Sequence, residues 1–159
     1  MKIDTLTPER FWGKLHPRGV PDSWHPLEDH CLDVASVARA LMELPTWQRR
    51  LGAVGLPVAT PAARDALALI VGLHDIGKFA EGFQRARLGG KPASHTQAGV
   101  AVLNMAVDGP ALRVVRRALG GTLSTLAHQD LLHAAICHHG RPLPEGGAKD
   151  IAWTNTDLE

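Results

Sequence analysis

The sequence predicts an all-α domain. In several segments apolar residues recur at steps of three and four, the spacing that places them on one face of a helix. No segment shows a convincing alternation of apolar and polar residues, which would indicate a strand, and no internal repeat is present. The chain has 159 residues, the size of one domain. We therefore expect residues 1–159 to form a single helical bundle of about five or six helices.

The composition limits which residue types can fill the core and which cellular compartment is expected. Hydrophobic residues make up 45% of the chain but aromatic residues only 4%, so Ala, Leu and Val must fill the core. A net charge of +1 gives no global basic field for nucleic acid, although it leaves room for a local basic groove. The longest apolar run is far shorter than the roughly 18 residues of a membrane span, and no secretion signal is present. Two cysteines form no disulfide framework. We expect a cytoplasmic protein without a membrane partner.

The first helix is expected to begin at Pro26, because a proline is tolerated where no backbone N–H is needed. Residues 1–25 contain several prolines and are expected to be irregular. From Leu27 apolar residues follow at helical spacing, and the helix should end near residues 44–45. Residues 45–61 are rich in proline and glycine, which indicates a connection with about one helical turn.

The second helix is expected over residues 62–73. It should end directly before His74 and Asp75, with Gly77 as the breaker that supplies a tight turn. A short helix over residues 80–87 and a Gly/Pro turn at 88–93 should follow.

The last third of the chain carries clear helix-end signals. Ser94, followed three residues later by Gln97, forms a capping-box pattern that opens a helix. Gly140 stands at the position that a left-handed C-cap prefers. Residues 145–159 show no clear period and are expected to form an irregular tail. The helices expected here span residues 94–107, 110–119 and 123–139.

Histidines gather at or near the ends of these predicted helices, where side chains of several helices can meet. Imidazole nitrogen and carboxylate oxygen are ligands that suit divalent cations. Asp75 has two oxygens and can therefore bridge two metals about 3.5–4 Å apart, which could clamp a phosphate and activate a water. This pattern predicts a metal-dependent hydrolase. The candidate ligands are His30, His74, Asp75, His95, His138 and His139.

Each candidate also has a purely structural interpretation. His30 could be an ordinary core histidine, and His95 could simply be exposed after its helix cap. His138 and His139 could be imidazolium groups that favour the negative end of a helix. Lys78 could neutralise a substrate phosphate, or could merely pair with Asp75 or Glu81. The remaining residues are given a structural role: the histidines 16, 25, 128 and 133, and the arginines 113, 116 and 117, for which phosphate binding is the alternative.

The order of the candidate residues resembles the HD phosphohydrolase superfamily. It is most similar to one branch, the HD nuclease domain of the CRISPR-associated type I helicase–nuclease. The most specific segment is Leu73-His74-Asp75-Ile76-Gly77-Lys78-Phe79, followed by Phe83-Gln84. The resemblance covers about residues 12–140. Its other segments are Trp12-Gly13-Lys14, residues 30–35, Ser94-His95 with Ala98-Gly99, and His138-His139-Gly140.

The resemblance implies an HD-domain helical bundle with a metal site at converging helix ends. One metal site would match His30, His74 and Asp75 together with a later aspartate. The other would match His95, His138 and His139, with Asp75 between the two sites. Asp75 and Lys78 would be catalytic. The ligand set admits one or two divalent ions of Mn, Fe, Co, Ni or Zn, and Mg is a further candidate.

The function implied is degradation of single-stranded DNA in CRISPR interference. The strand would be displaced by a crRNA-guided surveillance complex and fed by a helicase, in cis or in trans. Two alternatives remain: a nucleotide phosphohydrolase of the wider HD superfamily, and an inactive HD remnant that acts as a binding module.

One departure from the family pattern concerns the later aspartate. In the family it lies on a further helix, several tens of residues after His-His-Gly. Only Asp150 and Asp157 follow Gly140, and neither lies in a serine-aspartate-tryptophan context. We therefore expect a chain that lacks its C-terminal helices, in which Asp75 holds one metal well and the other poorly.

Overall fold

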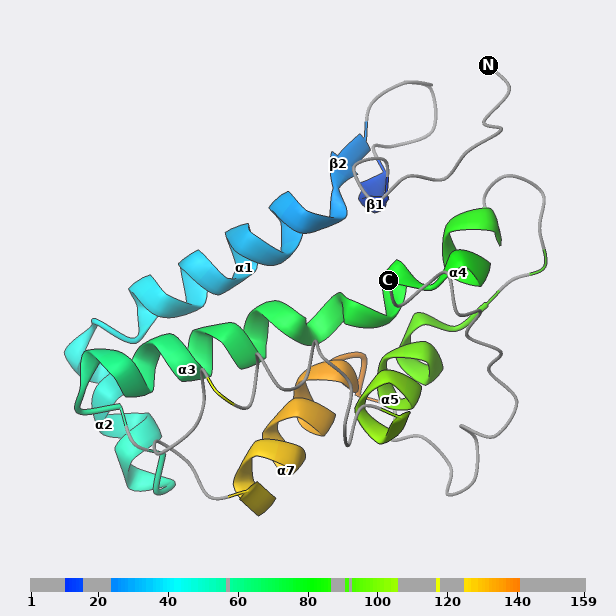
Figure 1. Ribbon diagram of the computed structural model, residues 1–159. Coiled ribbons are helices and arrows are strands. Elements are labelled where there is room, and N and C mark those ends of the chain that lie inside the picture. Colours follow the sequence, from blue (N-terminus) through cyan, green and yellow to red (C-terminus); the bar gives the residue numbers. More distant parts are fainter. Residues whose placement is uncertain are drawn as a thin grey trace.

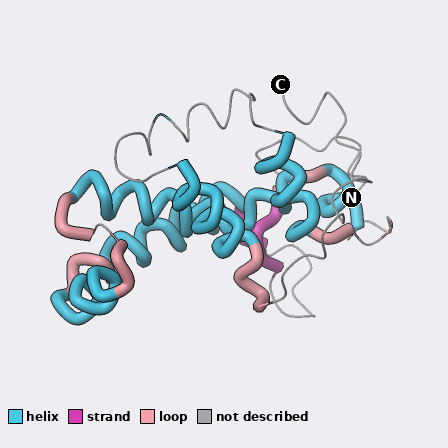
Figure 2. The backbone as a smooth tube through the Cα atoms, turned by 90° about the horizontal axis from the view of Figure 1, so that it is seen from below, coloured by secondary structure: helices cyan, strands magenta, loops and turns pink. Residues whose placement is uncertain are grey.

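Helices dominate the structure, a computed structural model, and confirm the all-α prediction (Figure 1). Figure 2 shows the same helices from a second direction, with helices in cyan and strands in magenta. Among the residues that the structure describes, no helix is long and apolar enough to cross a membrane. The expected helix over 110–119 and tail over 145–159 lie almost wholly outside the described residues. The structure describes residues 11–15, 24–56, 58–86, 91, 93–105, 117 and 125–140.

A short antiparallel strand pair precedes the first helix, where the sequence predicted irregular chain. It consists of β1 (Trp12–Leu15) and β2 (Trp24–Pro26). Strands of three or four residues are too short for alternation to reveal them. The prediction for Pro26 was also wrong by one residue, since it ends β2 and α1 begins at Leu27.

Two long helices lie side by side. α1 (Leu27–Leu41) and α3 (Pro61–Gly72) confirm the first two predicted helices, and α3 runs back alongside α1 (Figure 1). They approach closely at Gly72, where a Cβ atom would lie 3.0 Å from the Cβ of Ala35. The core beside them joins residues of α3 and α7 with Met42, directly after α1, and Val58, before α3. Its buried members are Met42, Val58, Ala66, Leu67, Ala68, Ile70 and Leu132.

The connection between these helices is itself helical, which corrects the sequence prediction. α2 (Pro45–Ala53) starts at a proline that needs no N–H partner. It is followed by Gly55 at φ +78°, a left-handed conformation that suits glycine. Proline and glycine here delimit a short helix and do not prevent one.

After α3, which ends at Gly72, the chain kinks at Asp75 (φ −105°, ψ 15°). It continues as the 3-10 helix η2 (Leu73–Phe79), and α4 (Glu81–Ala86) confirms the short helix predicted next. Gly77 lies inside η2, so the prediction of a breaker was wrong. A Cβ atom there would lie 1.7 Å from the carbonyl oxygen of His95. Gly77 is required because η2 packs directly against the next helix.

Two further helices complete the described fold. α5 (His95–Met105) begins as predicted, with the Ser94 hydroxyl accepting a hydrogen bond from the Gln97 N–H at 3.3 Å. α7 (Thr125–Ile136) ends three residues earlier than predicted. His138 and His139 therefore lie in the turn that follows it. Gly140 has φ +72°, which confirms its left-handed conformation.

Candidate metal centre

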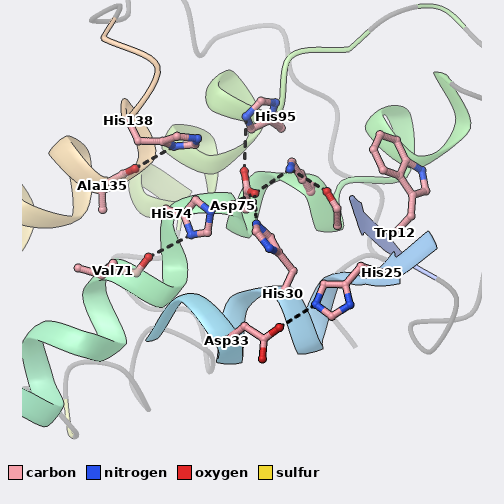
Figure 3. Close-up of polar contacts among 12 residues, drawn as sticks. Trp12, His25, His30, Asp33, Val71, His74, Asp75, His95, Ala135 and His138 are labelled. Atoms are coloured by element: carbon pink, nitrogen blue, oxygen red, sulfur yellow. Dashed lines mark hydrogen bonds and ion pairs between the residues drawn. The ribbon is translucent and has the colours of Figure 1, made fainter. Parts of the chain in front are cut away.

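The six predicted ligands come together at η2. Figure 3 shows five of them: His30, His74, Asp75, His95 and His138. Four elements deliver them: α1, η2, the first turn of α5, and the turn after α7. They form two groups of three, and within each group the possible ligand atoms lie within 4.8 Å of one another. One group is His30, His74 and Asp75, and the other is His95, His138 and His139.

Asp75 stands between the two groups and is only 2% exposed. Its Oδ2 faces the first group, with His30 Nε2 at 3.0 Å and His74 Nε2 at 3.1 Å. Its Oδ1 faces the second group, with His95 Nε2 at 3.6 Å. This Oδ1 is buried and has no hydrogen-bond partner among the described residues. A buried carboxylate oxygen without a partner is costly unless a cation or water completes it.

Backbone hydrogen bonds fix the orientation of two of the imidazoles. His74 Nδ1 donates to the carbonyl oxygen of Val71 at 3.1 Å, and His138 Nδ1 donates to that of Ala135 at 3.1 Å. Because a carbonyl only accepts, each Nδ1 carries the proton and each Nε2 is left toward the centre. Metal-binding histidines are commonly oriented in this way.

Several nitrogen and oxygen atoms of the site face each other at distances that need a proton or a cation between them. His95 Nε2 and His139 Nε2 are 3.2 Å apart. His74 Nε2 and Asp75 Oδ2 are similarly close. Two lone pairs at such separations repel unless a proton or a cation lies between them. The two groups also touch each other, since the His74 and His138 ring centroids are 4.9 Å apart.

The protonation states favour metal binding. Burial lowers the pKa of His30 and His95, and partial desolvation beside His139 lowers that of His138, which keeps these imidazoles neutral near pH 7. Burial alone would raise the pKa of Asp75, but the adjacent His74 ring and the Lys78 ammonium outweigh it and hold that pKa well below its usual range. A neutral imidazole and an ionised carboxylate are the forms that bind metal. Together with the unpartnered Oδ1, they fit a divalent cation.

A comparison with known families identifies the domain. The family model described as "Cas3, HD domain" matches residues 12–157. The chain belongs to the Cas3 HD domain family. No curated protein and no solved structure matches it. The resemblance inferred from the motifs is therefore confirmed, and the chain is an HD-type phosphohydrolase domain associated with CRISPR systems. HD domains bind divalent metals, and the two residue groups give this Cas3 HD domain suitable ligands.

Lys78 points into the centre of the Cas3 HD domain. Its Nζ donates to Asp75 Oδ2 at 2.7 Å and to the carbonyl oxygen of Gly13 at 2.9 Å. Of the alternatives considered for this lysine, the structure contains the ion pair with Asp75. The Gly13 contact was not foreseen, because it joins β1 to η2 across 65 positions.

Gln84 is a structural element of the site that sequence reasoning noted only within a motif. It is 1% exposed. Its Oε1 accepts from the Trp12 N–H at 3.0 Å, and its Nε2 donates to the carbonyl oxygens of Trp12 and Lys78 at 3.2 and 2.6 Å. The available sequence signal was the polar residue directly after Phe83. Gln84 ties β1 of the Cas3 HD domain to η2.

Among the residues given a structural role, His25 lies beside the first group, with its ring centroid 6.2 Å from that of His30. His25 pairs with Asp33 on the surface of α1 at 3.0 Å, and Arg117 is exposed. His133 lies 3.8 Å from the Sγ of Cys137. Burial raises the pKa of Cys31 to about 11, so this thiol is unreactive. His16, Arg113 and Arg116 are outside the described residues, and the side chain of His128 is as well.

Proposed function

We propose that this domain is a metal-dependent phosphodiesterase that degrades single-stranded DNA in CRISPR interference. The observation that carries the proposal is the position of Asp75, with one carboxylate oxygen toward each group of histidines. Such a bridging carboxylate suits two ions that act on one phosphate. Membership of the Cas3 HD family supports the CRISPR context.

In this proposal the residues divide their roles around Asp75. His30, His74 and Asp75 would hold one ion, and His95, His138 and His139 would hold the other beside Asp75. When bound, divalent ions lower the pKa of water and polarise phosphate oxygens. Asp75 stays ionised, and the backbone bonds of His74 and His138 keep their Nε2 atoms directed inward. Lys78 supplies a positive charge that can stabilise a phosphate in the transition state.

The site is asymmetric toward solvent. His30 and Asp75 are buried, whereas His138 and His139 are exposed. A strand of DNA would therefore approach from the side of the turn after α7. We further propose that the domain acts in the cytoplasm, with a crRNA-guided surveillance complex and a helicase, in cis or in trans, presenting the strand.

A cleavage assay tests the proposal. The Asp75→Ala variant should lose Mn²⁺-dependent cleavage of a labelled single-stranded oligonucleotide, while Asp33→Ala removes an exposed carboxylate of α1 and should retain it. Undiminished cleavage by Asp75→Ala contradicts the assignment. A nucleotide panel at equal metal concentration separates a nucleotide phosphohydrolase from a nuclease. A folded protein that takes up no metal and cuts nothing would instead be a binding module.

A further inference from the structure

The two oxygens of Asp75 differ in how well they are already neutralised. Oδ2 has three nitrogen neighbours within 3.1 Å: His30 Nε2, His74 Nε2 and Lys78 Nζ. Oδ1 has none within hydrogen-bond distance among the described residues. One oxygen of the carboxylate therefore already has a cationic partner, and the other does not.

The ammonium group of Lys78 is built into this position. The side chain is only 13% exposed, and Nζ is held by Gly13 as well as by Asp75. Gln84 bonds the carbonyl oxygen of Lys78 and both backbone polar groups of Trp12, so it fixes the strand that carries Gly13. Because both its ammonium group and its backbone carbonyl are bonded, Lys78 is not a freely moving surface charge.

We propose that Lys78 is a built-in counter-cation that makes the two ion sites unequal. The domain binds one divalent ion tightly, at His95, His138 and His139 with Asp75 Oδ1. It binds a second, at His30 and His74, only by displacing the Lys78 ammonium from Asp75 Oδ2. This inference rests on the proposed two-ion centre and adds an order of loading to it.

Charge and access both support this order. A second ion would have to share Oδ2 with an ammonium 2.7 Å away, and burial leaves little solvent to screen their repulsion. The His138–His139 group is exposed, whereas His30 lies behind it at a buried position. Displacement of Lys78 frees its ammonium for a phosphate oxygen, so phosphate should favour uptake of the second ion.

The first test is a Mn²⁺ titration of the purified domain. Calorimetry measures the binding, and electron paramagnetic resonance monitors the bound ions. Wild-type protein should bind one ion tightly and a second weakly. In Lys78→Met the second ion should bind at least about tenfold more tightly, because a like charge is removed from a buried site. Lys14→Met removes an exposed lysine of β1 and should match wild type. Two equal tight sites in wild type, or no change in Lys78→Met, overturn the proposal.

A second measurement needs no substitution and so does not depend on a variant that folds. Acetylation of lysines by an amine-reactive reagent, read by mass spectrometry, reports how well Lys78 is protected relative to Lys14. Protection of Lys78 should persist up to one equivalent of Mn²⁺ and fall several-fold as the second ion binds. Constant or increasing protection up to saturation overturns the proposal.

These outcomes are separate from the fate of the proposed function. Ion uptake in the stated order without cleavage of DNA would support the role of Lys78 and reject the nuclease. Cleavage of DNA with two equivalent ion sites would support the nuclease and reject the role of Lys78.

Discussion

Gly77 and His95 are in direct contact, because the carbonyl oxygen of His95 lies 1.7 Å from the place where a Cβ atom of Gly77 would be. The same atom would lie 2.4 Å from the backbone nitrogen of Gly99. The first turn of α5 therefore rests on η2 without any intervening side chain. This contact brings His95 Nε2 to 3.6 Å from Asp75 Oδ1. The geometry of the metal centre therefore depends on Gly77, which is not itself a ligand.

The variant Gly77→Ala should push α5 away from η2. We expect a loss of about 1–3 kcal/mol in the free energy of unfolding, as for other overpacked sites, and weaker binding of Mn²⁺ because His95 moves with α5. Thermal unfolding and metal titration measure the two effects. Gly52→Ala is the matched control, since its Cβ would meet nothing within 4 Å. It should be neutral or stabilise by up to about 1 kcal/mol. Equal behaviour of the two variants would disprove the contact.

The stability of the metal-free domain should fall as the solution becomes acidic. The pKa values of His30, His95 and His138 are lowered by burial, so the unfolded chain binds more protons than the folded one below a pH of about 6.5. Their contribution is complete above that pH and is lost as the pH falls toward the lowered pKa values. The contribution of Asp75 to stability is also lost on acidification, but only below about pH 4.

Thermal unfolding between pH 8 and pH 5, with a chelator present, measures this dependence. The variant His95→Gln cannot gain a proton and should show a shallower loss of stability in this range. A midpoint that rises on acidification would contradict the assignment of neutral histidines.

Replacement of Gln84 should destabilise the fold, although Gln84 is not one of the candidate ligands. In Gln84→Leu the backbone N–H of Trp12 and the carbonyl oxygens of Trp12 and Lys78 lose their bonds to it. Buried polar groups without partners cost about 1–3 kcal/mol. Gln84→Glu is nearly isosteric but places an acceptor against two carbonyl oxygens, and should be at least as destabilising. Chemical denaturation measures both, and a stable Gln84→Leu would show that β1 is held by other contacts.

Most of the candidate ligands could be predicted from the sequence because they lie where a helical pattern begins or ends. His74 follows a clear apolar period, His95 directly follows the cap residue Ser94, and His139 precedes a left-handed glycine. The structure brings all of them to Asp75. Their roles as ligands, and a single domain over residues 1–159, stay predictions.

Other features depend on contacts between distant segments and could not be predicted. Gln84 bonds Trp12 across 72 positions, and no local pattern records such a pair. Gly77 looks like a helix breaker in sequence, since the same residue serves turns and close packing. The length of α2 was underestimated, because proline and glycine were counted without regard to their places near its ends.

Divalent metal should stabilise the folded domain through the exposed histidines after α7. A ligand that binds only the folded state adds about 2.7 kcal/mol at a hundred times its dissociation constant, so Mn²⁺ should raise the unfolding midpoint and excess chelator should reverse the rise. His139→Ala should lose most of this response, because His139 lies 3.2 Å from His95 within the second group. His133→Ala, which removes an exposed histidine from α7, should keep it. Similar responses in these two variants would show that Mn²⁺ stabilises the domain somewhere other than the His95, His138 and His139 group, and a wild-type midpoint unaffected by Mn²⁺ would show that the folded domain holds no such ion.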